Sequence, residues 1–347
     1  MSTSPLGEER EERERRLQRI RHEAEQHALI PFPEEHERSK PLEASAEKGY
    51  YGMPLLKRPQ WTVEIPIYFF VGGAAGAAAV IAAIGEVSTK DRAIIRDAQW
   101  LAAIGGLVSP ALLISDLGMP SRFLGMLRVF KIQSPMSVGS WTLVAFSNAA
   151  VASAVLGELQ RRRKVPGVPV LHRTSQIAAA LTGLVLSTYT GVLIGATAIP
   201  VWNEHVSSLP IHFAVSGVLT ATSILELRGH DSAALNKLGM MAAVLETVMG
   251  ASIELRKTPA EHPIRHGISG EAMRGAGLLS GPVPLALRAF AMLSDKHERK
   301  LRKAAAVSSI VGSLLTRWAW IKAGHASAQN PRIPLELENP SNHERAR

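Results

Sequence analysis

Apolar residues are grouped into long runs, separated by short polar stretches, from residue 64 to residue 322. Each run is about 20 residues long, which is the length that a helix needs to cross the hydrocarbon core of a bilayer. We therefore predict an all-α fold, a polytopic membrane helix bundle with about eight transmembrane helices. The predicted helices cover residues 64–86, 98–115, 138–159, 174–198, 210–228, 234–255, 276–294 and 304–322.

The last two segments are less regular than the first six. Pro282 and Pro284 interrupt the seventh segment, and the eighth is short and rich in Ala and Ser. A total of seven helices therefore stays open at this point. Eight helices could form two four-helix groups, although we detect no convincing internal repeat in the sequence. Gly-xxx-Gly spacings, as between Gly72 and Gly76, indicate helices that pack closely.

Polar segments flank the predicted transmembrane domain (61–322), as an N-terminal extension (1–60) and a C-terminal tail (323–347). Residues 8–27 alternate acidic and basic side chains, which favours a solvated, salt-bridged helix, with a flexible charged arm as the alternative. The first 30 residues contain no apolar core of a signal peptide. We therefore expect the first transmembrane helix to direct insertion.

Charge adds an orientation to this picture. The net charge is +9, and the loops after the first, third, fifth and seventh helices carry more Lys and Arg than the loops on the other side. The positive-inside rule then places those loops in the cytoplasm, and both termini outside. We find no basic patch interleaved with aromatic residues, so the positive charge indicates contact with anionic lipid rather than with nucleic acid.

Cysteine is absent from the chain. This excludes disulfides, thiolate zinc sites and cysteine-ligated iron–sulfur clusters within it. A bis-histidine haem needs two imidazoles at matching depth inside the bundle. The histidines fall in predicted loops or at helix ends, as at His205 and His212, so we predict no haem. No spacing of His and carboxylate residues on one helix indicates a metal site.

Two polar motifs stand between the second and third apolar segments. They are DLGMPSRF at residues 116–123 and SPMSVGSW at residues 134–141. An acid, an arginine and several hydroxyl groups thus lie where membrane helices meet the surface. Ionisable groups in such segments are candidates for function. The serines and Pro135 are expected to shape the turn and to cap the third helix.

These motifs resemble those of the NrfD/polysulfide-reductase membrane-anchor family. The resemblance begins at WTVEIPIYFFVGG (61–73), includes both motifs of the 116–141 connection, and continues at YTGVLI (189–194) and PVW (200–202). It covers about residues 50–230 well and the last helices only loosely.

The resemblance implies a multi-pass subunit of the bacterial inner membrane, without haem or an iron–sulfur cluster of its own. Such a subunit exchanges electrons between menaquinone or ubiquinone and an extrinsic, ferredoxin-like iron–sulfur subunit. A molybdopterin-type catalytic subunit often completes such a complex, which serves anaerobic respiration. The chain would then be one component of a quinone-linked oxidoreductase and would not be catalytic alone.

A quinone site needs hydrogen-bond partners for two carbonyl oxygens, a titratable group and an apolar slot. Glu64 and Tyr68 share one face of the first helix, and Asp116 and Arg122 follow the end of the second helix on the same side of the membrane. We therefore predict that these four residues bind quinone. Members of the family commonly carry Asn or His where Glu64 and Tyr68 stand. The alternatives are an Asp116–Arg122 ion pair that shapes the turn, a water-facing Glu64 and an interfacial Tyr68.

One acid, Glu246, lies in the middle of the sixth predicted helix, where an unpaired charge is costly. Arg288 in the seventh helix is its natural partner, and we regard Glu246 and Arg288 as candidates for proton transfer. An ion pair between them would favour a structural role, whereas a lone, protonatable Glu246 would favour a proton path. Glu226, near a helix end, is expected to be exposed. Two other functions stay open: an ion-translocating or transporter-like protein, which inverted repeats would support, and a structural anchor without a quinone site.

Overall fold

The computed structural model of the protein describes residues 15, 18, 19, 56–88, 91–256, 258–293 and 297–330. The membrane-type helices all belong to one compact unit, Pro54–Arg347. The charged helix expected over residues 8–27 lies outside the described residues, apart from Arg15, Gln18 and Arg19, which are helical.

Every regular element among these residues is a helix, and eight helical spans are long and apolar enough to cross a membrane. The prediction of an all-α bundle with eight membrane helices is therefore confirmed. The eight spans are α3 (Glu64–Ser88), α4 (Arg92–Leu117), α6 (Pro135–Arg162), α7 (Val168–Gly195), α9 (Leu209–Leu227), α10 (Ala233–Leu255), the broken pair α12–α13 (Gly267–Leu293) and α14 (Glu298–Gln329).

The last two spans differ from the sequence-based expectation. The seventh begins at Gly267 and consists of α12 (Gly267–Ser280) and α13 (Pro282–Leu293), separated at Gly281 because Pro282 has no backbone N–H to continue the ladder. The eighth is the longest helix in the described part of the chain, with 32 residues, and reaches Gln329, beyond the expected end at 322. It also begins at Glu298, before the expected start at 304, because its first turns are basic and do not belong to an apolar run.

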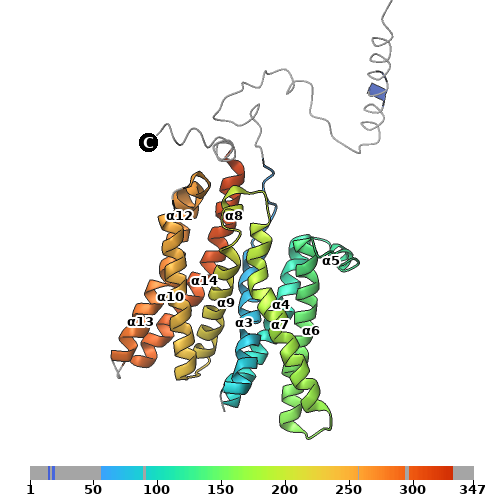
Figure 1. The fold of residues 1–347 in the computed structure, drawn as a ribbon, viewed down its shortest axis with the longest axis vertical. Helices are drawn as coiled ribbons and strands as arrows, with labels where there is room; N and C mark the ends of the chain where they lie inside the picture. Colours follow the sequence, from blue (N-terminus) through green and yellow to red (C-terminus); the bar gives the residue numbers. More distant parts are fainter. Residues whose placement is uncertain are drawn as a thin grey trace, which may run out of the picture. The chain divides into compact units, whose positions relative to one another are not determined.

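Short helices connect the spans on one side of the bundle. We call this the entry side, meaning the side where α3, α6 and α9 begin and where α4, α7 and α10 end (Figure 1). The connecting helices are α5 (Pro120–Met126), α8 (Pro200–Asn203), η1 (Pro259–Glu261) and α11 (His262–Arg265).

The connection between α4 and α6 is built by local hydrogen bonds. Gly118 ends α4 with φ 70°, a left-handed conformation that glycine adopts without strain. The Ser134 hydroxyl caps α6 by accepting from the backbone N–H of Ser137, at 3.4 Å. The Ser137 hydroxyl in turn accepts from the N–H of Lys131 and donates to the carbonyl of Val129. The expectation that these serines shape the turn and cap the helix is confirmed.

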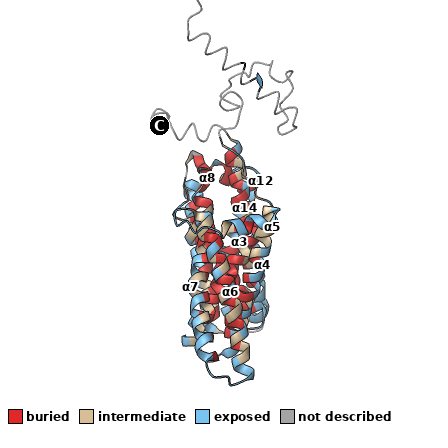
Figure 2. Ribbon diagram, turned by 90° about the vertical axis from the view of Figure 1, so that its right-hand side faces the viewer, coloured by how far each residue is buried: buried red, intermediate tan, exposed pale blue. Residues whose placement is uncertain are grey.

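The eight spans form two four-helix groups (Figure 1). The first group contains α3, α4, α6 and α7, and the second contains α9, α10, α12–α13 and α14. The groups meet where α9 packs against α3 and α7, and where α14 packs against α3. Buried residues concentrate along the interior of this bundle (Figure 2).

Glycine allows the central helices to approach each other at backbone distance. A Cβ atom added to Gly217 of α9 would lie 2.7 Å from the carbonyl oxygen of Gly73 in α3, and one added to Gly76 would lie 2.3 Å from the carbonyl oxygen of Gly183 in α7. Lipid removes most of the hydrophobic driving force between helices, so this close packing is a main source of their association.

We predict that Gly217→Ala destabilises the bundle, because its methyl group would collide with the backbone of α3 and overpacking of this kind costs about 1–3 kcal/mol. The matched control is Gly250→Ala in α10, where an added Cβ meets no atom within 4 Å and helix propensity improves. Apparent melting temperatures in detergent measure the difference. Equal stability of the two variants would contradict the proposed role of the α3–α9 contact.

Candidate functional site

A pocket in the first four-helix group opens near the entry side. Its volume is about 160 Å³. It is formed by the beginnings of α3 and α6, the end of α4 and the last turns of α7. Its walls are mainly apolar, with a few polar groups among them. The lining comprises Trp61, Ile65, Tyr68, Phe69, Leu113, Asp116, Leu117, Met126, Met136, Gly139, Ser140, Tyr189 and Leu193.

The polar groups of this first pocket come from four helices. Tyr68 is buried, with 2% of its surface exposed, and its side chain lines the pocket. Tyr189 donates its hydroxyl proton to the carbonyl of Pro135, and Ser140 donates to the carbonyl of Ser137 at 3.0 Å. Gly139 makes room for the Tyr189 ring, which an added Cβ would overlap. The pocket therefore has donors and acceptors at several points of an apolar wall.

Asp116 fixes the mouth of this pocket. Its Oδ1 accepts hydrogen bonds from the backbone N–H and the hydroxyl of Thr62, the first at 3.1 Å. The carboxylate at the end of α4 thereby holds the residues that precede α3. The neighbouring Trp61 stacks on Trp202 of α8 with ring centroids 5.2 Å apart, so the start of α3 is held both by α4 and by the connection between α7 and α9.

The structure brings together two of the four predicted site residues. Tyr68 and Asp116 line the same pocket, whereas Glu64 and Arg122 lie outside its lining. Glu64 is the first residue of α3. Arg122 is exposed on α5 and donates to the carbonyl of Leu117 at 3.2 Å. The considered Asp116–Arg122 ion pair is not formed among the described residues, because Asp116 is engaged by Thr62.

Sequence reasoning did not select Tyr189 and Ser140 as site residues. Both stand in quoted motifs, but they come from α7 and α6, and no spacing along the chain shows that these helices face Tyr68. The signal that could have identified Tyr189 is an aromatic hydroxyl in an otherwise apolar segment, followed by Gly191.

A comparison with protein families accords with this architecture. A family model described as polysulfide reductase, of the NrfD type, matches residues 47–330. The chain belongs to the NrfD/polysulfide reductase family. None of the curated proteins matches it significantly in sequence. Family membership identifies a multi-pass membrane protein of the kind that serves as the membrane subunit of a redox complex.

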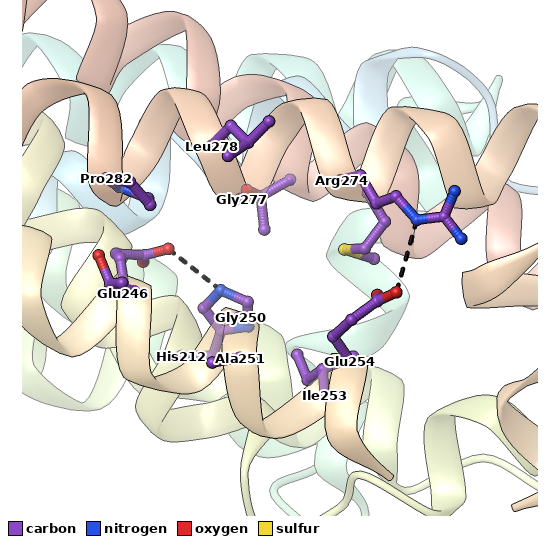
Figure 3. A pocket seen from close by; sticks show the side chains of 13 residues that line it. His212, Glu246, Gly250, Ala251, Ile253, Glu254, Arg274, Gly277, Leu278 and Pro282 are labelled. Atoms are coloured by element: carbon purple, nitrogen blue, oxygen red, sulfur yellow. Dashed lines mark hydrogen bonds and ion pairs between the residues drawn. The ribbon is translucent and has the colours of Figure 1, made fainter. Parts of the chain in front are cut away.

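This NrfD-family chain has a second, larger pocket in its second four-helix group. The volume is about 380 Å³. Figure 3 shows His212 and Glu246 at one end and the Glu254–Arg274 ion pair at the other. Glu246 is 2% exposed, and its Oε2 lies 3.2 Å from Nε2 of His212 and accepts from the Ser280 hydroxyl at 3.1 Å. His212 is buried inside the bundle near the start of α9, deeper than expected for a residue at a helix end.

The predicted pairing of Glu246 with Arg288 is wrong. Arg288 is fully buried and donates two hydrogen bonds to Glu226, both at 2.7 Å, and a third to Asn236 at 3.0 Å. Glu226, expected to be exposed, is buried as well. It lies near the end of α9, where α13 supplies Arg288 and α14 supplies Arg302 at 3.5 Å. The bidentate geometry gives Arg288 a structural role on the side opposite to the pockets.

A further histidine–carboxylate pair lies in the connections on the entry side. Nε2 of His205 is 3.4 Å from Oε1 of Glu261, and both side chains are almost completely buried. Burial lowers the pKa of His205 to about 4 and raises the pKa of Glu261. Both shifts favour the uncharged forms, as expected where a low-dielectric environment penalises charge. Within the described ranges, no cluster of three or more His, Asp or Glu has the geometry of a metal site.

We predict that Arg288→Met destabilises the subunit by about 3–5 kcal/mol, because Glu226 would keep its buried charge without its main partner. The double variant Glu226→Gln/Arg288→Met should recover most of this loss. Chemical denaturation in detergent provides the measurement.

The control is Arg161→Met, which removes one partner of the Glu158 cluster, where Arg162 also lies 2.8 Å away. Exposed pairs of this kind contribute about 0–1 kcal/mol. If Arg288→Met and Arg161→Met changed stability equally, the Glu226–Arg288 pair would not have the structural role assigned here.

Proposed function

We propose that this chain is the integral membrane subunit of a respiratory oxidoreductase and that it exchanges electrons between a membrane quinone or quinol and an extrinsic iron–sulfur subunit. The observation that carries the proposal is the first pocket. It combines apolar walls with Tyr68, Asp116, Ser140 and Tyr189 next to the entry side. Family membership supports the same assignment.

The pocket has the chemistry that a quinone headgroup requires. A quinol that is oxidised releases two electrons and two protons, and a quinone that is reduced takes them up. The carboxylate of Asp116 is a proton acceptor or donor at the mouth, while the hydroxyls of Tyr68 and Ser140 are partners for carbonyl or hydroxyl oxygens of the ring. At about 160 Å³ the pocket is smaller than the roughly 300–1,000 Å³ of whole-ligand sites, so it would hold the ring and leave the tail between helices.

The electrons need a partner, because a chain without cysteine cannot hold a cysteine-ligated cluster. We propose that the partner is a ferredoxin-like iron–sulfur protein, extended by a molybdopterin-type catalytic subunit. We propose that the quinone is menaquinone or ubiquinone and that the complex lies in the bacterial inner membrane. Glu64 and Arg122 are not part of the pocket wall. We propose that they act only outside the pocket, on the path by which quinone or protons reach its mouth.

The connection between α4 and α6 is the proposed docking surface for that partner. It lies directly beside the first pocket, since Met126 of α5 lines it. Several large apolar side chains of this connection are exposed outside the membrane-spanning helices, as would suit a protein interface. They are Met119, Leu124, Val129, Phe130 and Ile132.

We predict that Asp116→Asn slows quinol-dependent turnover by on the order of 10²-fold, the scale typical of a lost acid–base group. Tyr68→Phe should raise the apparent KM for quinol with a smaller effect on the maximal rate, because it removes a hydrogen bond to the ring. Both rates are measured in membranes and normalised to assembled complex.

The matched control is Asp97→Asn, the same substitution at the other end of α4, where Asp97 pairs with Arg228 and His230. It should leave turnover per assembled complex unchanged. Normal turnover in both Asp116→Asn and Tyr68→Phe would refute the pocket as the site of quinone chemistry.

The docking surface can be tested because the natural chain offers a cysteine-free background. We predict that Phe130→Cys forms thiol-directed crosslinks to an iron–sulfur subunit in native membranes. Val165→Cys, in the α6–α7 connection on the opposite side, should not. Crosslinks from Val165→Cys and none from Phe130→Cys would show that the partner binds the opposite side, and would contradict the proposed docking surface.

A further inference from the structure

The first helix of each four-helix group carries a short repeated segment near its start. Residues 65–73 of α3 read IPIYFFVGG, and residues 209–217 of α9 read LPIHFAVSG. The aligned segments share Pro, Ile, Phe, Val and Gly at the same positions. The sequence alone did not indicate a repeat, because the two similar segments are short and lie far apart.

Equivalent residues of this repeat contact each other. Phe69 packs against Phe213 with ring centroids 6.2 Å apart, and Gly73 meets Gly217 at backbone distance. Contacts between equivalent positions are the signature of a two-fold relation. Since α3 and α9 both begin on the entry side, the relation is that of parallel repeats about an axis along the membrane normal. Any site in one group therefore has its counterpart on the same side of the membrane.

The two pockets are such counterparts. Each is lined by residues from all four spans of its group, and in both the first helix contributes residues near its start and the second contributes residues toward its end. The repeat alignment places His212 at the position of Tyr68, and both side chains line their pockets. We propose that the second pocket is a second binding site for a quinone or quinol headgroup; the ligand class rests on the function proposed for the first pocket.

The polar end of the second pocket suits this class of ligand. Glu246 and His212 form a buried acid–imidazole pair, and Glu246 Oε1 and His212 Nδ1 have no hydrogen-bond partner among the described residues. A ring oxygen that hydrogen-bonds to this pair would satisfy groups whose burial is otherwise costly. The pair also provides a carboxylate and an imidazole that can exchange protons with a quinol hydroxyl. Glu246, a proton-transfer candidate from its sequence position, thereby obtains a specific role.

The remaining walls leave room for the ring and an exit for its tail. Gly250 of α10 and Gly277 of α12 line the pocket, and a Cβ added to either would meet no atom within 4 Å. The volume of about 380 Å³ lies within the roughly 300–1,000 Å³ range of small-molecule sites. Leu278 on the rim is 56% exposed, so the pocket reaches the outer surface between α10 and α12. This is where an isoprenoid tail can pass into lipid.

The test is photoaffinity labelling of the assembled complex in membranes with an azido-ubiquinone probe, followed by mass spectrometry of the labelled peptides. We expect label in two regions, one around 61–73 and 116–140 and the other in 246–282. Gly250→Leu, which fills the second pocket, should reduce label in 246–282 at least fivefold and leave label at the first pocket unchanged. Gly277→Leu is the second variant if Gly250→Leu does not assemble.

Val248→Leu is the control, because Val248 is an exposed residue of the same helix outside the pocket lining. It should keep both labels. Label at the first pocket alone, or label in 246–282 that neither glycine variant reduces, overturns the second site and leaves the proposed function intact. Label in 246–282 alone supports the second site and counts against the first. Absence of label from both regions counts against both.

Discussion

Backbone contact between helices, permitted by glycine, is the constraint on which this structure depends. In a bilayer the apolar side chains gain little by leaving lipid, so the central helices are held by close packing instead. Gly73 against Gly217 joins the two four-helix groups, and Gly76 against Gly183 joins α3 to α7 within the first group. Both contacts involve α3, which makes this helix the centre of the bundle. The position of α3 then decides where Tyr68 and the mouth of the first pocket lie.

Buried charge is distributed in a way that separates structure from function. On the side opposite to the pockets, Arg288 and Glu226 satisfy each other through two short hydrogen bonds, which fixes α13 against α9. Arg317, at the junction of the groups, donates to the carbonyl of Phe213 and lies over its ring at 4.2 Å. Near the entry side, Glu246 and His212 each keep one buried atom without a hydrogen-bond partner among the described residues, and both line a pocket. Polar groups that the fold does not satisfy itself are those most suited to a ligand.

The two-fold relation between the groups gives the proposed functions a common geometry. Both pockets lie near the entry side, and the connections there differ between the groups. The first group has α5 with exposed apolar side chains, whereas the second has η1 and α11 with the buried His205–Glu261 pair. One group thus exposes apolar side chains beside its pocket, and this is the surface proposed for docking. The other group has the larger pocket and the buried acid–imidazole pair. In our proposals both groups therefore bind a quinone headgroup, and only the first group has a docking surface beside its pocket.

The sequence alone determined the first six membrane spans, the approximate position of the last two and the family resemblance, because the length of apolar runs and the local turn motifs are properties of neighbouring residues. It also selected Tyr68, Asp116 and Glu246, since a polar group in or beside an apolar run is conspicuous. Tertiary structure decided how these residues are partnered. Asp116 bonds Thr62 rather than Arg122, and Arg288 bonds Glu226 rather than Glu246. Partners depend on which helix faces meet, and this is set by backbone contacts between segments far apart in the chain. The same contacts bring the similar segments of α3 and α9 together, as at Phe69 and Phe213.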